Sequence, residues 1–290
     1  MPAGQPFTQL CQTLARPRYF GRVDLHLHTT FSDGTYTPVQ IVDLARRSGL
    51  SALAITDHDT LAGIAPTRLA AGAALEVVAG VEITAEFRGK ELHLLGYLFD
   101  AANTALNAAL DHLREERVGR FHEMIERLRT LGVPIEEAAV ARLGDAASLG
   151  RRHLAELLVQ TKKAATVREA FQRYLGDRAR ATVPKTRLPV ADAIALVRAA
   201  GGVASWAHPV YDCSRERLLE LKALGLGAVE VEYPTMRMSR RKELRHWANE
   251  LGLAITGGSD CHGPGEPHRT VGASSISHDE LDRLREQCGD

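Results

Sequence analysis

The sequence lacks the features of a secreted, membrane-spanning or nucleic-acid-coating protein. Its 290 residues include only four cysteines, scattered without paired spacing, which excludes a disulfide scaffold and favours a reducing compartment. It has no apolar run of transmembrane length, and its first residues lack the apolar core of a signal peptide. Its formal net charge is +0, so no global basic field holds long nucleic acid. We therefore expect a cytoplasmic protein with no membrane or stable protein partner and a small or short ligand.

The alternation of strand-like and helix-like segments predicts an α/β fold. Residues 22–28, 53–56, 77–84 and 91–97 read as strands, with helices at 37–48 and 63–74. The first helix has Thr37 as N-cap, Pro38 at its first position and Gly49 as its stop. After Pro184, helices at 190–200, 218–224 and 239–251 alternate with strands at 203–207, 228–232 and 253–257. About seven strands without an internal repeat predict a mainly parallel (β/α) barrel.

The middle of the chain departs from this alternation. From about residue 103 to 182 helical periodicity dominates and no strand interrupts it. We interpret 103–182 as an α-helical insertion that caps the substrate site of a barrel built from 21–102 and 183–290. Residues 1–20 contain proline and glycine without clear periodicity, and we interpret them as an N-terminal arm.

Histidine is unusually frequent, with 12 copies, many of them close to aspartate or glutamate. His26 and His28 share a predicted strand, and both imidazoles point to one face because strand side chains alternate. Asp33 follows them, and Gly34 allows the tight turn that presents this carboxylate beside the strand end. His58 lies where an apolar strand gives way to a turn, the position from which barrels draw their catalytic residues.

Five more candidates occupy similar segments. Glu82 lies inside an apolar strand, where a carboxylate is costly unless it is paired or binds a metal. His93 lies in the following strand, and His208 ends another apolar strand. Asp260 and His262 alternate after the last strand, between glycines that permit close backbone approach. Single motifs also allow structural interpretations: a structural pair for His26 and His28, a helix cap for Asp57 or Asp59, and a core histidine for His93.

Together these motifs predict a multinuclear metal centre. The nine candidate ligands are His26, His28, Asp33, His58, Glu82, His93, His208, Asp260 and His262. Mixed imidazole and carboxylate ligands suit Mn, Fe or Zn better than Ca or Mg. Nine ligands exceed the needs of one catalytic ion, so we expect two or three divalent ions, with Mn²⁺ favoured and Fe²⁺ or Zn²⁺ as alternatives. Such ions polarise an oxyanion and generate hydroxide near neutral pH, which fits phosphate esters best.

The ordered set of motifs resembles the PHP family, named for polymerase and histidinol phosphatase domains. The matching elements are His26-Leu-His28 with Asp33-Gly34, Thr56-Asp57-His58, Glu82, His93, Ala207-His208-Pro209 and Gly258-Ser259-Asp260-Cys261-His262. The resemblance implies a distorted (β/α)7 barrel with an α-helical insertion. It is nearest to stand-alone bacterial enzymes that remove the 3′-phosphate from nucleoside 3′,5′-bisphosphates, some of which degrade short RNA from the 5′ end.

The resemblance also implies how the ligands divide among the ions. One ion would take His26, His28, Glu82 and Asp260. A second would share Glu82 and add His93 and His208, and a third would take Asp33, His58 and His262. Catalytic roles would fall to Asp33, His58, Glu82, His208 and Asp260.

Candidates for binding the substrate come from four further positions. Gly150-Arg151-Arg152-His153 matches a Gly-Arg-x-His element of that branch, so Arg151 and His153 are expected to face the substrate phosphate. An exposed helix position is the alternative for Arg151. Lys185, which stands where histidine is usual, and His268 would help neutralise the oxyanion. His268 is also a candidate proton donor to the leaving oxygen.

We therefore expect a hydrolase, a metal-dependent phosphoesterase in which metal-bound hydroxide attacks a phosphomonoester of a nucleotide-like substrate. The alternatives are a 5′–3′ exonuclease acting on short RNA and a histidinol-phosphate phosphatase. A non-catalytic metal-binding module is a different class. Modules of that kind typically lose ligands, whereas this sequence keeps all nine.

Overall fold

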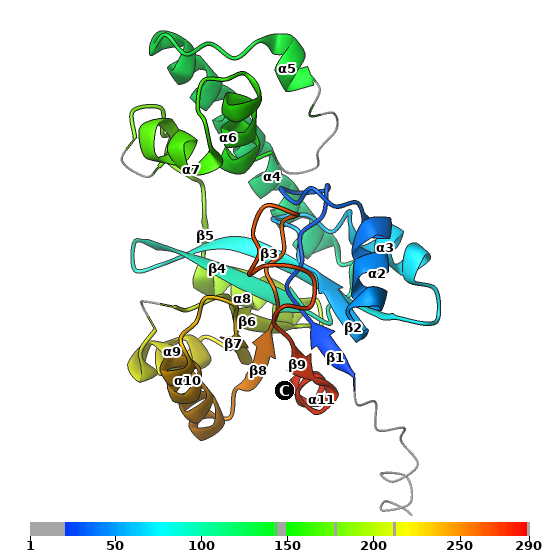
Figure 1. Cartoon of the computed structure of the whole chain (residues 1–290). Helices are drawn as coiled ribbons and strands as arrows, with labels where there is room; N and C mark the ends of the chain where they lie inside the picture. The colour runs from blue at the N-terminus through cyan, green and yellow to red at the C-terminus, as the bar shows by residue number, and fades with distance from the viewer. Residues whose placement is uncertain (1–20, 142, 144–148, 177–178, 211–212, 289–290) are drawn as a thin grey trace, which may run out of the picture.

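The computed structural model describes residues 21–141, 143, 149–176, 179–210 and 213–288. The predicted N-terminal arm, residues 1–20, lies outside the described residues. A twisted sheet forms the body of the molecule, and a group of helices stands above it in Figure 1. No helix in the described part of the chain is both long and apolar enough to cross a membrane.

Eight strands form a nearly closed, barrel-shaped sheet in the order β8-β7-β6-β4-β3-β2-β1-β9, and β5 pairs with β3 beside this path. The strands are β1 (Arg22–Asp24), β2 (Leu50–Ile55), β3 (Glu76–Phe87), β4 (Lys90–Tyr97), β5 (Leu188–Pro189), β6 (Val203–Trp206), β7 (Ala228–Glu232), β8 (Ala254–Gly257) and β9 (Ile276–Ser277). The predicted α/β barrel is confirmed. The short strands β5 and β9 were not predicted, and β9 runs antiparallel to β1.

The expectation of a mainly parallel sheet needs one correction, because β4 runs antiparallel to both of its neighbours, β3 and β6. Only Arg88 and Gly89 connect β3 to β4, and both have positive φ angles, 55° and 76°. A two-residue turn of this kind joins antiparallel strands, whereas a parallel pair needs a crossover of about a dozen residues or more. The hairpin therefore places one reversed strand between two parallel sets, β1–β3 and β6–β8, and distorts the barrel.

Helices flank the sheet (Figure 1): α2 (Pro38–Arg47), α3 (Ile64–Ala71), α8 (Val190–Ala199), α9 (Arg215–Ala223), α10 (Met238–Leu251) and α11 (His278–Glu286). Helix α2 begins as predicted, since the Thr37 hydroxyl accepts a hydrogen bond from the backbone N–H of Gln40 at 3.4 Å. Helix α11 was not predicted. Its Leu281 and Leu284 pack in one apolar cluster with Val23, so the end of the described chain covers its beginning.

The segment between β4 and β5 contains only helices in its described part: α4 (Thr104–Thr130), α5 (Glu137–Ala141), α6 (Arg151–Gln160), α7 (Val167–Ala170) and the π-helix η1 (Phe171–Leu175). These helices share an apolar core of their own, which includes Phe121, Met124, Leu128, Leu154 and Leu158. This core is distinct from the clusters that hold the barrel together. The first half of α4 belongs to the barrel core instead, through Leu106, Leu110 and Leu113. The second half of α4 and the later helices stand above the sheet (Figure 1).

The seam of the barrel lies between the chain after β1 and the chain after β8. The backbone N–H of Leu25 donates to the carbonyl of Gly257 at 3.0 Å, and that of His28 donates to the carbonyl of Cys261 at 3.1 Å. Gly258 lies so close to the segment after β1 that a Cβ at this position would be 2.3 Å from the backbone nitrogen of His26. Only glycine permits this approach, which brings Asp260 beside His26.

Replacing Gly258 by alanine should therefore open the seam. We expect Gly258→Ala to lower the free energy of unfolding by about 1–3 kcal/mol, the usual cost of overpacking, as measured by denaturant titration. Gly265→Ala is the matched control, since a Cβ at Gly265 meets nothing within 4 Å. Equal stability of the two variants would contradict the close approach at Gly258.

Candidate metal centre

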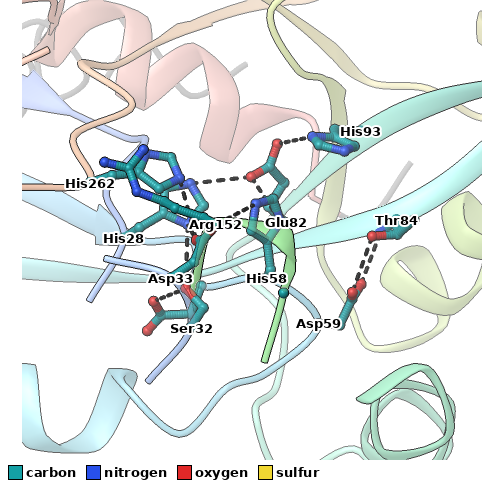
Figure 2. Close-up of polar contacts among 12 residues, drawn as sticks. His28, Ser32, Asp33, His58, Asp59, Glu82, Thr84, His93, Arg152 and His262 are labelled. Atoms are coloured by element: carbon teal, nitrogen blue, oxygen red, sulfur yellow. Dashed lines mark hydrogen bonds and ion pairs between the residues drawn. The ribbon is translucent and has the colours of Figure 1, made fainter. Parts of the chain in front are cut away.

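The Glu82 carboxylate, on β3, lies at the centre of a group of histidines and is only 1% exposed. Its Oε1 atom lies 2.8 Å from Nδ1 of His93 and 3.1 Å from Nε2 of His208. Its Oε2 atom lies 3.2 Å from His28 Nε2, 3.2 Å from His58 Nδ1 and 3.4 Å from His26 Nε2. Figure 2 shows three of these histidines, His28, His58 and His93, around Glu82. One carboxylate thus contacts five imidazoles that come from four separate segments of the chain.

Two aspartates complete the group. Asp260 Oδ1 lies 3.4 Å from Nε2 of both His26 and His28. Asp33 Oδ1 lies 3.3 Å from His262 Nε2, and Asp33 Oδ2 lies 3.8 Å from Nε2 of His58. The structure therefore brings all nine predicted ligand residues together at one end of the sheet, while their individual roles stay predictions.

Three overlapping groups within this cluster could each hold an ion: His28, Asp33, His58 and His262; His26, His28 and Glu82; and His58, Glu82 and His93. The first differs from the division implied by the resemblance in adding His28, and the third contains His58 in place of His208. The three groups overlap in His28, His58 and Glu82. A neutral imidazole offers one acceptor nitrogen, so of these residues only the Glu82 carboxylate, with its two oxygens, can serve two ions at once.

The donor atoms fit divalent cations. Nε2 of His28, Oδ1 of Asp33 and Nδ1 of His58 are buried and make no hydrogen bond within the described chain. A buried polar atom without a partner destabilises the fold, and a bound cation would supply the missing partner. Imidazole nitrogens with carboxylate oxygens are the donors that Mn, Fe and Zn accept.

The carboxylates are held in the ionised form that binds cations. Burial alone would raise the pKa of Glu82, but the charges of His58 and His93 outweigh it and hold this pKa well below its usual value. Burial also opposes charge on His28, yet the neighbouring carboxylates of Asp260 and Glu82 raise the pKa of this imidazole to about 10. Because metal ligands must be deprotonated, cations and protons compete for the histidine.

Two candidate ligands have a strained backbone. His208 has a φ of 32° and Asp260 a φ of 51°, in the left-handed region that non-glycine residues seldom occupy. The backbone N–H of Asp260 donates to the carbonyl of His26 at 2.8 Å, which helps to hold this conformation. Strain of this kind gathers at functional sites because the surrounding contacts maintain it.

Glu230, on β7, is a functional candidate that the sequence analysis did not single out. Its Oε1 atom lies 2.9 Å from Nδ1 of His26, and its Oε2 atom accepts the backbone N–H of His208 at 2.5 Å. A carboxylate only accepts, so Nδ1 of His26 carries the hydrogen and Nε2 is directed towards Glu82. The sequence signal was present, because Glu230 is an acidic residue inside an apolar strand, as Glu82 is.

Asp57 and Asp59 hold the loops that carry the ligands, and the helix-cap alternative is wrong for both. Asp57 accepts the backbone N–H of Thr29 at 2.7 Å and the hydroxyl of Ser32 at 2.6 Å, which fixes the chain before Asp33. Asp59 accepts the backbone N–H of Thr84 at 2.8 Å. The cap position of α3 is Gly63, which has no side-chain hydrogen bond.

The four predicted substrate-binding residues are not gathered at one point as the nine predicted ligands are. Arg151 donates to the carbonyl of Leu175 at 3.2 Å, inside the helical segment. Nδ1 of His153 accepts the backbone N–H of Gly150 at 3.1 Å. Lys185 pairs with Glu91 at 2.9 Å, and Glu91 also lies 3.0 Å from Nε2 of His93. His268 is exposed. Their roles stay predictions.

Three arginines that the sequence analysis passed over lie nearer to the predicted ligands. Arg269 Nη1 lies 3.0 Å from Asp260 Oδ2. Arg117, on α4, forms a buried ion pair with Asp59, the residue after His58. Arg152, on α6, is drawn with the ligand group in Figure 2. Burial opposes the charge of Arg152, but its hydrogen bond to Glu266 and the charge of Asp33 outweigh this effect and raise its pKa. Without the fold, nothing separated these arginines from the many on solvent-exposed faces.

Comparison with known proteins agrees with this geometry. The sequence model of the PHP domain matches residues 24–126. A 5′-3′ exoribonuclease of Haemophilus influenzae is 34% identical over 84% of this chain and 90% of its own length. A 3′,5′-nucleoside bisphosphate phosphatase of Chromobacterium violaceum is 33% identical over 86% and 90%. A solved structure from Bifidobacterium adolescentis, assigned as a metal-dependent phosphoesterase, has a TM-score of 0.86 at 32% identity and covers 92% of this chain and 96% of that one.

The Glu230 contacts predict a loss of metal affinity. We expect Glu230→Gln to weaken Mn²⁺ binding about tenfold to a hundredfold, as removal of a hydrogen-bond partner of a ligand does, in titrations of metal-stripped protein. Glu232→Gln, on the same strand, is the control, because Glu232 pairs with Arg241 and Arg245 away from the ligands. Equal affinity in Glu230→Gln and the wild type would show that Glu230 does not orient His26.

Proposed function

This chain belongs to the PHP domain family, and from that premise we propose that it is a metal-dependent phosphoesterase that hydrolyses a phosphomonoester of a nucleotide-like substrate. The 3′-phosphate of a nucleoside 3′,5′-bisphosphate is the preferred candidate. The observation that carries this proposal is the buried Glu82 carboxylate, shared by five histidines and flanked by Asp33 and Asp260. An arrangement of this size serves several cations and suits a reaction in which negative charge develops on phosphate oxygens.

Two or three divalent ions, Mn²⁺ by preference and Fe²⁺ or Zn²⁺ as alternatives, would be held by the nine residues. We propose that His26, His28, Glu82 and Asp260 hold one ion and that Glu82, His93 and His208 hold a second. Asp33, His58 and His262 would hold a third. When bound, the ions supply Lewis-acid polarisation of the phosphoryl oxygens and activation of water. Such ions activate phosphate esters in general, so the side chains around them must select the substrate.

The remaining tasks fall to the residues of the chain. Glu230 holds the hydrogen on Nδ1 of His26 and thereby fixes the orientation of that ring. Asp57 fixes the loop before Asp33 through Thr29 and Ser32. These hydrogen bonds preorganise the site before substrate arrives, so little reorganisation opposes the reaction.

We propose that residues 103–182 cap the site, as their place in the sequence suggested. Two contacts support this role. Arg117 of α4 pairs with Asp59 beside His58, and Arg152 of α6 pairs with Glu266 in the loop that follows Asp260 and His262. A cap tied to the loops that carry ligands can exclude water from the reacting phosphate.

A second candidate activity is 5′–3′ exonuclease action on short RNA, which the similarity to the Haemophilus influenzae protein favours about equally. The net charge of +0 favours the smaller substrate, because long RNA is held mainly by basic surfaces. Low cysteine content supports a place in the cytoplasm. Histidinol phosphate has no specific support among the observed contacts.

The first test removes predicted ligands. We expect His26→Ala and Asp260→Ala each to abolish phosphate release and to lower the metal content per chain, because each variant removes a donor from the buried centre. Metal content is measured by elemental analysis and turnover by phosphate release. His112→Ala, at an exposed position of α4, should leave both unchanged. Wild-type turnover in either ligand variant would overturn the assignment.

The second test compares substrates. We expect the wild-type protein with Mn²⁺ to hydrolyse adenosine 3′,5′-bisphosphate with a higher kcat/KM than a 5′-phosphorylated RNA pentanucleotide. Phosphate release measures the first reaction, and the appearance of mononucleotides measures the second. Faster cleavage of the pentanucleotide would favour the exonuclease, and turnover of neither would argue against a nucleotide substrate.

A further inference from the structure

Two arginines from different parts of the chain share one glutamate beside the metal centre. Arg152 lies in the first turn of α6, and its Nη1 atom is 3.1 Å from Oε1 of Glu266. Arg269 lies in the loop between β8 and β9, and its Nε atom is 3.3 Å from Oε2 of the same glutamate. The two guanidinium groups therefore hold one oxyanion between the helical segment and the barrel.

Arg269 is fixed firmly at the edge of the centre. Its Nη1 atom lies 3.0 Å from Oδ2 of Asp260, and its Nη2 atom donates to the Tyr233 hydroxyl at 2.6 Å. Its guanidinium carbon lies 5.4 Å from the centre of the Tyr233 ring. Arg152 is steadied by Glu156, whose Oε1 atom lies 3.3 Å from its Nε. Both cations are thus held in place by residues other than Glu266.

Glu266 is the most weakly held member of the trio. Its side chain is 40% exposed, against 21% for Arg152 and 26% for Arg269. Ion pairs at exposed positions contribute little to stability and are readily exchanged for other partners. A phosphate carries more charge than a carboxylate and matches the guanidinium fork at two oxygens, so it competes well for this place.

We propose that Arg152 and Arg269 form a second anion subsite, which binds a phosphate group of the substrate that is not hydrolysed, and that this phosphate displaces the carboxylate of Glu266. The assignment rests on the proposed function, because it presumes a substrate with two phosphate groups. In a nucleoside bisphosphate the ribose separates the phosphates, so the second group lies beside the metal centre rather than in it. Arg269 at Asp260 and Arg152 near Asp33 occupy that border.

The test compares adenosine 3′,5′-bisphosphate with adenosine 3′-monophosphate on the full chain loaded with Mn²⁺. We expect Arg152→Ala to lower the ratio of the two kcat/KM values, bisphosphate over monophosphate, by about tenfold or more, as loss of a charge-assisted hydrogen bond does. Arg152→Lys should retain part of the ratio, because it keeps the charge and loses the fork. Glu266→Gln should raise the ratio, because the amide competes less well for the arginines.

Arg173→Ala is the matched control, since this arginine of η1 pairs with Glu169 on the surface of the same helical layer. We expect its ratio to stay within about twofold of the wild type. An unchanged ratio in Arg152→Ala would overturn the subsite, and so would a fall in the ratio caused by Arg151→Ala but not by Arg152→Ala.

A binding measurement separates this inference from the proposed function. Adenosine 5′-monophosphate, titrated calorimetrically into the wild-type protein and Arg152→Ala, should bind about tenfold more weakly to the variant. If the wild type hydrolyses neither nucleotide but shows this difference in affinity, the proposed reaction fails and the subsite stands. Equal affinities together with wild-type hydrolysis of the bisphosphate would overturn the subsite alone.

Discussion

The position of one buried charge, the carboxylate of Glu82, sets the requirements for the rest of the site. A carboxylate that is 1% exposed strongly destabilises a fold unless cations or hydrogen-bond donors surround it. Five imidazoles meet this need, and each approaches within 3.4 Å. Since these histidines follow β1, β2 and β6 or lie in the first half of β4, the barrel must bring those parts of the strands to one place.

The reversal of β4 is part of this solution. Parallel strands present their carboxyl ends at the site, but His93 stands in the first half of its strand, opposite Thr84 in the register with β3. Because the hairpin at Arg88 and Gly89 turns β4 around, its beginning lies where the parallel strands end. The distortion of the barrel therefore delivers a ligand that a strictly parallel barrel would place at the opposite end.

Sequence reasoning succeeded where residue type and strand position together restrict the chemistry. Apolar strands with carboxylates or histidines at or near their ends predicted the barrel and all nine residues of the cluster centred on Glu82. Sequence reasoning failed where the role of a residue depends on which distant residues it contacts in the fold. Helix α11 has a largely polar sequence, and only the fold shows that its apolar residues Leu281 and Leu284 pack in one cluster with Val23. Arg151 was singled out, and Arg152 was not, because Arg151 matches the Gly-Arg-x-His element; sequence alone does not show that Arg152 is the one that pairs with the barrel residue Glu266.

The formal charge of +0 conceals an ordered separation of charge. Carboxylates occupy the centre, and cations at its edge are each paired: Arg117 with Asp59, Lys185 with Glu91, and Arg152 with Glu266. Burial decides which of these pairs can open for an anionic substrate. Breaking a buried pair such as Arg117 and Asp59, 9% and 2% exposed, costs about 3–5 kcal/mol, whereas an exposed pair contributes about 0–1 kcal/mol. The first kind fixes α4 to the barrel, and the second can exchange its carboxylate for another anion.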